Sequence, residues 1–338
     1  MKNIILLSLF ALSNTSYAIN VSPYKTGQKL THEQAEELQQ RYKTREQQPW
    51  EKPDSAESII KDPNAELIQY GIQVLDKTVE TIGPNVDDKS KRYSGNSLNC
   101  SSCHLKGDTQ LPGTKYDAIP FTNVTNDYPQ FRGRDLSIAT AAARSNGCMT
   151  RSMGYGKELP LDSKEMKGIL AYYDWLAEGT KKNQAMDGSG LPPIELPDRK
   201  ADVSSGKDVY QTYCVACHGQ DALGLKAPDY EQTGNYTFPP LAGEDSFDDG
   251  AGMSRLIKAS RFVHANMPLG ASSKNPMLTV DQAFDVSAYF LSLPRENRKG
   301  RENDFPDPDF RPADYPVPEY FKGDTKALER AKLGPYTK

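Results

Sequence analysis

Two short motifs constrain this 338-residue chain more than any other feature of its sequence. The stretches CSSCH (100–104) and CVACH (214–218) are two copies of the pattern C-x-x-C-H, one in each half of the chain. A structural zinc site does not require a histidine directly after a cysteine pair, and a redox dithiol occurs once, beside a βαβ pattern. One turn of C-x-x-C-H lets both thiols bond to the vinyl groups of a haem while the histidine ligates the iron. The repeat therefore predicts two covalently bound haem c groups, attached by Cys100, Cys103, His104, Cys214, Cys217 and His218.

Each motif is followed by a segment with the apolar periodicity of a closing helix. Residues 163–179 place apolar side chains at helical spacing and end at a glycine, whereas residues 280–294 do so and end at a proline. Residues 31–47 predict a polar helix ahead of the first motif. These patterns predict a mainly α fold built from two cytochrome c-type haem domains.

Changes in composition divide the chain around the two motifs. Residues 19–180 form an N-terminal extension with the first haem domain, and residues 203–300 form the second haem domain. Residues 181–202 are rich in Gly, Pro and charge and predict a linker. Residues 301–338 are rich in Pro and Asp and predict an extended C-terminal tail.

The first 18 residues have the composition of an export signal. An apolar run from Ile4 to Leu12 is followed by polar residues and by small residues at Ser16 and Ala18. No later run reaches the roughly 18 apolar residues of a membrane span, so we expect a periplasmic protein without such a span. The formal net charge is −4 and no block of Lys and Arg stands out, which argues against nucleic acid as a partner.

Cys148 is the one cysteine outside the two motifs, and it follows the first motif. A free thiol in an exported protein is a hazard unless it is paired, buried or used. Ligation of the first haem iron by Cys148 would account both for the thiol and for the position opposite His104. The alternative is a buried, inert Cys148 with Met149 or Met153 on the iron.

The second haem needs a different ligand opposite His218. Met267, in the sequence NMPLG, is the predicted ligand, and a thioether opposite imidazole raises the haem potential. Met253 and Met277 are the competing candidates.

The surroundings of Cys148 are basic in an acidic protein. Residues 130–160 contain four arginines and one lysine against two carboxylates. Such an excess favours the thiolate and attracts an anionic substrate, and arginine can bind the oxygens of a sulfonate group in a forked geometry. We therefore predict catalytic roles for Cys148, Arg144 and Arg151, although haem propionates are an alternative partner for these arginines.

These residues lie in segments that resemble the dihaem thiosulfate dehydrogenases, periplasmic cytochromes c that interconvert thiosulfate and tetrathionate. The resemblance runs from about residue 85 to residue 295 and is strongest in NCSSCH (99–104), FRGRDL (131–136), RSNGCMTRSMGYGKELP (144–160), YCVACHG (213–219) and the block that ends in NMPLG (238–270).

The resemblance implies a division of labour between the two haems. The first, ligated by His104 and Cys148, would be the active site, and the second, ligated by His218 and Met267, would exchange electrons with a small periplasmic or membrane-anchored cytochrome. Some family members carry Lys directly before the methionine, where this chain has Asn266, which predicts His/Met ligation in both redox states. The alternatives are a dihaem electron carrier without a substrate and a sulfur-oxidising cytochrome similar to SoxAX.

Overall fold

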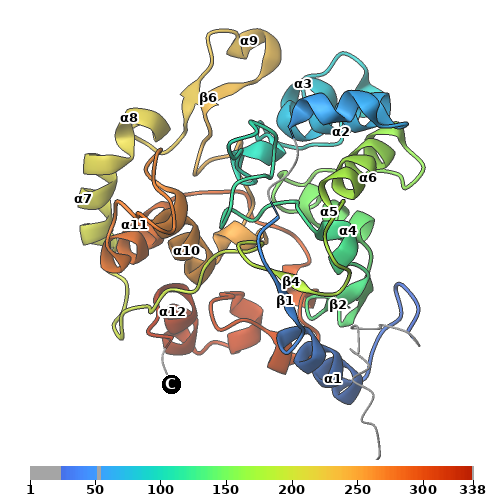
Figure 1. Cartoon of the computed structure of the whole chain (residues 1–338). Helices are drawn as coiled ribbons and strands as arrows, with labels where there is room; N and C mark the ends of the chain where they lie inside the picture. The colour runs from blue at the N-terminus through green and yellow to red at the C-terminus, as the bar shows by residue number, and fades with distance from the viewer. Residues whose placement is uncertain (1–23, 52–54, 337–338) are drawn as a thin grey trace, which may run out of the picture.

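The computed structural model describes residues 24–51 and 55–336, and this part of the chain is mainly helical (Figure 1). The strands of the described residues form three sheets of two strands each. The predicted mainly α fold is thus confirmed. The predicted export signal, residues 1–18, lies outside the described residues. Among the residues described, no helix has the length and apolar character needed to cross a membrane.

The elements around the first motif gather on one side of the molecule, at the right of Figure 1. They are η1 (Ala56–Lys61), α2 (Ala65–Asp76), α3 (Thr78–Ile82), η2 (Lys89–Lys91), η3 (Cys100–Ser102), α4 (Val124–Asp127), β2 (Gln130–Arg132), β3 (Ser137–Ala139), α5 (Ala141–Met149) and α6 (Lys164–Leu176). Helix α6 matches the closing helix predicted within 163–179. Helices α2 and α6 cross closely, because a Cβ added to Gly71 would lie 2.0 Å from the carbonyl oxygen of Gly168.

The second motif has a corresponding group of elements at the left and top of Figure 1. They are α7 (Val203–Tyr213), α8 (Val215–His218), β5 (Leu225–Lys226), α9 (Tyr230–Thr233), β6 (Tyr236–Phe238), η4 (Gly252–Ser254), α10 (Leu256–Asn266) and α11 (Val280–Ser292). Helix α11 matches the second predicted closing helix. It crosses α7 at Gly206, where an added Cβ would lie 2.0 Å from the carbonyl oxygen of Asp285.

The two halves share one apolar core. A single buried cluster runs from Ile59 and Met166 in the first half to Tyr210 and Phe290 in the second. Polar contacts also join the halves, since the Asn96 side chain donates a 2.9 Å hydrogen bond to the Ser246 carbonyl. The predicted linker also packs on the first half, where its strand β4 (Ala185–Met186) pairs in parallel with β1 (Gln47–Gln48).

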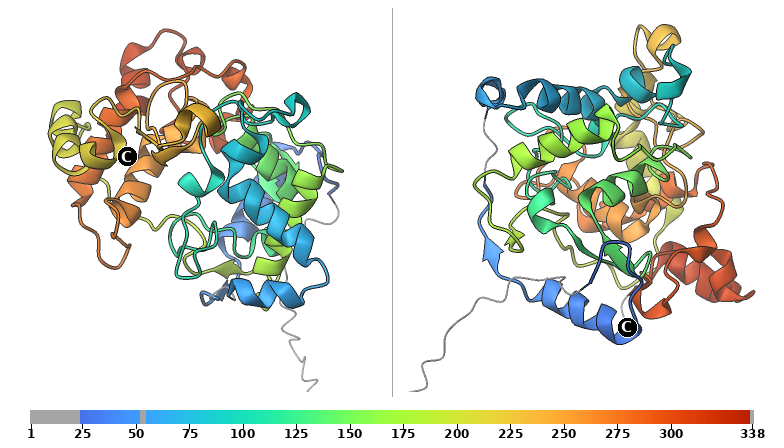
Figure 2. Two further views of the ribbon diagram at one scale, coloured as in Figure 1. Left: turned by 90° about the horizontal axis from the view of Figure 1, so that it is seen from above. Right: turned by 90° about the vertical axis from the view of Figure 1, so that its right-hand side faces the viewer.

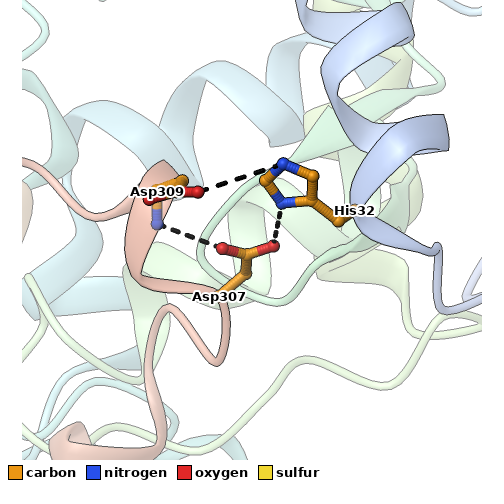
Figure 3. Close-up of side chains that lie close together, drawn as sticks. All are labelled: His32, Asp307 and Asp309. Atoms are coloured by element: carbon orange, nitrogen blue, oxygen red, sulfur yellow. Dashed lines mark hydrogen bonds and ion pairs between the residues drawn. The ribbon is translucent and has the colours of Figure 1, made fainter.

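The N-terminal extension and the C-terminal tail meet beneath the first half, as the right-hand view of Figure 2 shows. Helix α1 (His32–Lys43), predicted within 31–47, begins at a capping box formed by Thr31 and Gln34. Its first residue contacts the tail, because His32 Nδ1 lies 2.7 Å from Asp307 Oδ2, with Asp309 beside it (Figure 3).

The tail differs from the extended segment that its composition predicts. It contains η5 (Arg301–Asn303), η6 (Pro308–Phe310), η7 (Pro318–Phe321) and one α-helix, α12 (Thr325–Leu333). Asp324 caps α12 by accepting a hydrogen bond from the Ala327 amide. The prediction was wrong here because no proline lies within this segment and an N-cap residue precedes it.

Candidate active site

The first C-x-x-C-H motif lies on a short 3₁₀ turn packed against α3. Thr78 fixes this turn, because its hydroxyl oxygen accepts a 3.0 Å hydrogen bond from the Cys100 amide. None of the five cysteines forms a disulfide. Burial raises the pKa of Cys100 to about 11 and that of Cys103 to about 12. Both thiols are unpaired and partly buried, and Cys100 packs against the apolar core, so both are available for thioether attachment of a haem.

The histidine of this motif is oriented for ligation. Its Nδ1 donates a 2.6 Å hydrogen bond to the Ile119 carbonyl, which leaves the Nε2 lone pair available. The Phe121 ring stacks on the imidazole with a centroid distance of 4.2 Å. The first motif therefore fits a haem c with His104 as the proximal ligand.

The second motif repeats this arrangement between α7 and α8. His218 Nδ1 donates a 2.8 Å hydrogen bond to the Pro239 carbonyl, so Nε2 is again the available nitrogen. Burial lowers the pKa of His218, which favours the neutral imidazole that binds iron. This motif also fits a haem c.

Cys148 lies on the last turn of α5 and faces the first motif. Its thiol is hydrogen-bonded to His104 and accepts a 2.8 Å hydrogen bond from Arg144 Nη1. Burial opposes ionisation of this thiol, but the charge of Arg144 and the two hydrogen bonds outweigh it and lower the pKa of Cys148 to about 6. The α-helical spacing of four residues puts Arg144 and Cys148 on one face, so this contact follows from the sequence.

The methionines near Cys148 are all core residues. Met149, Met153 and Met166 are 4%, 3% and 0% exposed and belong to the apolar cluster shared by the two halves. The structure therefore brings together two of the three predicted catalytic residues, Cys148 and Arg144, opposite His104.

Arg151, the third predicted catalytic residue, has a partner from the tail. Its Nη2 lies 2.8 Å from Asp304 Oδ1, and Arg134 pairs with the other oxygen of the same carboxylate. The Tyr315 hydroxyl also donates to Asp304, at 2.6 Å. Asp304 was not predicted from the sequence, because 153 positions separate it from Arg151 and no motif marks it.

Met267 follows the last residue of α10 and is partly buried against the shared core. The residue before it, Asn266, donates a 2.9 Å hydrogen bond to the Asp117 carbonyl of the first half. Of the competitors, Met253 is also partly buried on the core, whereas Met277 is 49% exposed.

Comparisons with known proteins agree with this geometry. The family described as cytochrome C oxidase, cbb3-type, subunit III matches residues 201–289. Thiosulfate dehydrogenase from Psychrobacter arcticus is 32% identical over 257 residues, covering 76% of this chain and 72% of that protein. Thiosulfate dehydrogenase from Allochromatium vinosum is 37% identical over 203 residues, covering 60% of this chain and 72% of that protein.

A solved structure gives the same result for the fold. The as-isolated thiosulfate dehydrogenase (TsdBA) from Marichromatium purpuratum superposes with a TM-score of 0.64 at 31% identity. The match covers 74% of this chain and 50% of that chain, so this chain spans half the length of that longer protein.

A mainly helical fold in which a C-x-x-C-H histidine is oriented by a backbone carbonyl defines a c-type cytochrome that binds haem c. The sequence identity and the coverage of the matches then narrow this class to one family. The chain belongs to the thiosulfate dehydrogenase family of oxidoreductases.

Proposed function

We propose that this protein is a periplasmic dihaem enzyme that interconverts two thiosulfate ions and one tetrathionate ion. The observation that carries the proposal is the 2.8 Å contact between Arg144 Nη1 and Cys148 Sγ, at a thiol that faces His104. In this proposal His104 and Cys148 would ligate the first haem iron, and His218 and Met267 would ligate the second. A small periplasmic or membrane-anchored cytochrome is the electron partner of the second haem.

The chemistry begins at the Cys148 sulfur. Arg144 holds this sulfur as a thiolate, and the thiolate bonds to the outer sulfur of the first thiosulfate. Forming that S–S bond from two anionic sulfurs releases two electrons, and two bound haems would supply one acceptor for each. The product is an adduct in which the sulfane sulfur links Cys148 to a sulfonate group.

A second thiosulfate completes the reaction. Its outer sulfur attacks the sulfane sulfur of the adduct, and the bond to Cys148 breaks with its electron pair returning to the cysteine. Tetrathionate leaves, and the low pKa of Cys148 makes this thiolate a good leaving group. Reversing the two steps gives tetrathionate reduction.

The two arginines have different tasks in this scheme. Arg144 contacts the reacting sulfur directly. Arg151 is held by Asp304, and its buried Nε has no hydrogen-bond partner among the described residues; in this proposal the charge of its guanidinium attracts the anionic substrate.

Replacing the reacting thiol tests the proposal. Cys148→Met should retain haem but lose both thiosulfate oxidation with ferricyanide and tetrathionate reduction with a reduced viologen. The wild-type ferric protein should show the low-spin spectrum of thiolate ligation, and the variant should lose it. Turnover retained by Cys148→Met would exclude this mechanism. No turnover in the wild type at normal haem content would instead indicate an electron carrier.

A further inference from the structure

Residues 115–119 of the first half form a bridging segment between the two halves of the protein. The Ile119 carbonyl accepts the 2.6 Å hydrogen bond from His104 Nδ1 that orients this imidazole. Two residues earlier, the Asp117 carbonyl accepts the 2.9 Å hydrogen bond from the Asn266 side chain. Asn266 directly precedes Met267, so one short segment contacts the chain at both proposed iron ligands.

A second hydrogen bond ties the bridging segment to the chain after Met267. Lys115 Nζ donates a 3.1 Å hydrogen bond to the Ala271 carbonyl. The Ala271 amide in turn donates a 2.9 Å hydrogen bond to the Pro268 carbonyl, which closes a turn directly after Met267. The bridging segment therefore holds the chain on both sides of Met267.

The contact between Asp117 and Asn266 excludes water. Asp117 is 9% exposed and Asn266 is 2% exposed. A buried hydrogen bond is costly to leave unmade, because water does not replace the lost partner. This contact therefore fixes the bridging segment against the second half in one arrangement.

The backbone of the bridging segment is strained. Asp117 and Ile119 have φ angles of 57° and 54°, in the left-handed region, and Ile119 is the only β-branched residue with such an angle among the described residues. Strain of this kind persists only where the surrounding structure holds the chain, and it clusters at functional sites. The amides of the same two residues donate to the carbonyls of Gly188 and Gly190, at 2.9 and 3.4 Å, so the segment cannot relax without losing hydrogen bonds.

We propose that the bridging segment is a positioning element shared by the two haem sites, through which the hydrogen bond that orients His104 depends on the chain around Met267. The inference rests on the haem ligation of the proposed function. A carbonyl that accepts from Nδ1 raises the basicity of the imidazole toward iron and thereby lowers the haem potential. A change that releases Asp117 also loosens Ile119, two residues away, and weakens this hydrogen bond.

The first experiment breaks the contact between the halves without changing any charge. Asn266→Leu keeps the branched shape of the side chain and removes its donor. The midpoint potential of the first haem, measured on the holoprotein by spectroelectrochemistry, should rise, and the EPR g values of this haem should change with it, because its imidazole is held less firmly. Asn275→Leu, at an exposed position of the second half, is the matched control and should leave both unchanged.

A second experiment uses a partly exposed residue of the bridging segment, so it decides the question even if Asn266→Leu does not fold. Lys115→Met removes the hydrogen bond to Ala271. On warming, the charge-transfer absorption of the methionine-ligated ferric haem should disappear at a lower temperature than in the wild type. Lys274→Met removes an equal charge from an exposed position of the loop after Met267 and should behave as the wild type.

Two results would overturn the inference. If Asn266→Leu changes only the second haem, the contact between the halves acts locally and does not reach His104. If Lys115→Met and Lys274→Met behave alike, the loss of a charge explains the effect, and the bridging segment is not a shared positioning element.

These measurements do not require turnover, so they also separate this inference from the proposed function. A wild-type protein without turnover, in which Asn266→Leu still shifts the first haem, would disprove the proposed reaction and support the positioning role. A wild-type protein that turns over, with the first haem unaffected by Asn266→Leu, would support the reaction and disprove the positioning role.

Discussion

The two halves that carry the C-x-x-C-H motifs are built alike and surrounded differently. In each, a glycine lets two helices cross within contact of their backbones, and the Nδ1 of the motif histidine donates to a backbone carbonyl. The first half adds a thiol and a group of cations, whereas the second adds a partly buried methionine. In the proposed function one scaffold serves two tasks, because it would fix each haem attachment while the residues opposite the histidine would decide the chemistry at each site.

Removing the charge beside Cys148 would make the first half resemble the second. Arg144→Leu should lower kcat/KM for thiosulfate roughly 100-fold or more, because the thiolate and the developing anion lose a buried donor. Steady-state kinetics measure the effect. Arg144→Lys should recover part of the rate, and Arg41→Leu on exposed α1 should leave it unchanged. A near-normal rate in Arg144→Leu would mean that the basic surroundings do not distinguish the two halves.

Removing the buried tail carboxylate tests how the first half depends on the C terminus. Asp304→Asn leaves Arg134 and Arg151 unpaired and should reduce the free energy of unfolding by about 3 kcal/mol. Denaturation followed at the haem absorption measures the loss. The matched change Asp162→Asn, at an exposed position, should have little effect. Equal stability of the two variants would show that the tail merely covers the first half.

Adding a methyl group at each of the two helix crossings tests whether the two halves depend equally on close helix packing. Gly71→Ala and Gly206→Ala would each place a methyl 2.0 Å from a backbone oxygen, so each should cost about 1–3 kcal/mol of stability. Thermal unfolding of the holoprotein measures both. Gly190→Ala is the control, since nothing lies within 4 Å of an added Cβ there. If only one of the two variants loses stability, the two helix crossings are not equivalent.

The smallest expected effect concerns the contact between α1 and the tail (Figure 3). The hydrogen bond with Asp307 raises the pKa of His32 above its ordinary value of 6.5. The stabilisation that this hydrogen bond provides is therefore fully present below pH 6.5, and it is lost as the pH rises through the raised pKa of His32 in the folded protein. Limited proteolysis of the tail should be slower at about pH 6 than at about pH 8 in the wild type. His32→Gln should remove this pH dependence, and a dependence that survives would assign it to another group.

Local sequence was sufficient to predict a structural feature wherever that feature depends on the spacing of residues close together in the chain. The closing helices α6 and α11 follow from their apolar periodicity, and Arg144 reaches Cys148 because four residues make about one helical turn. Helix α12 was missed because composition over the whole tail outweighed a short helical segment with its own N-cap.

Contacts between distant segments could not be predicted in this way. Asp304 comes from a tail whose sequence suggests only irregular structure. Nothing in its neighbouring residues indicates that it pairs with Arg134 and Arg151. Its importance depends on which cations it meets after folding, and that is a property of packing.

The sequence by itself determined the mainly helical fold and the family and predicted the haem attachment and the proximal histidines, because each follows from motifs or periodicities within one or two turns of chain. The tertiary structure decided which of the basic side chains meet a carboxylate, as Arg134 and Arg151 meet Asp304 of the tail. The physical reason is that charge pairing acts through space, and residues from the first half, the second half and the tail meet only when the shared core has formed.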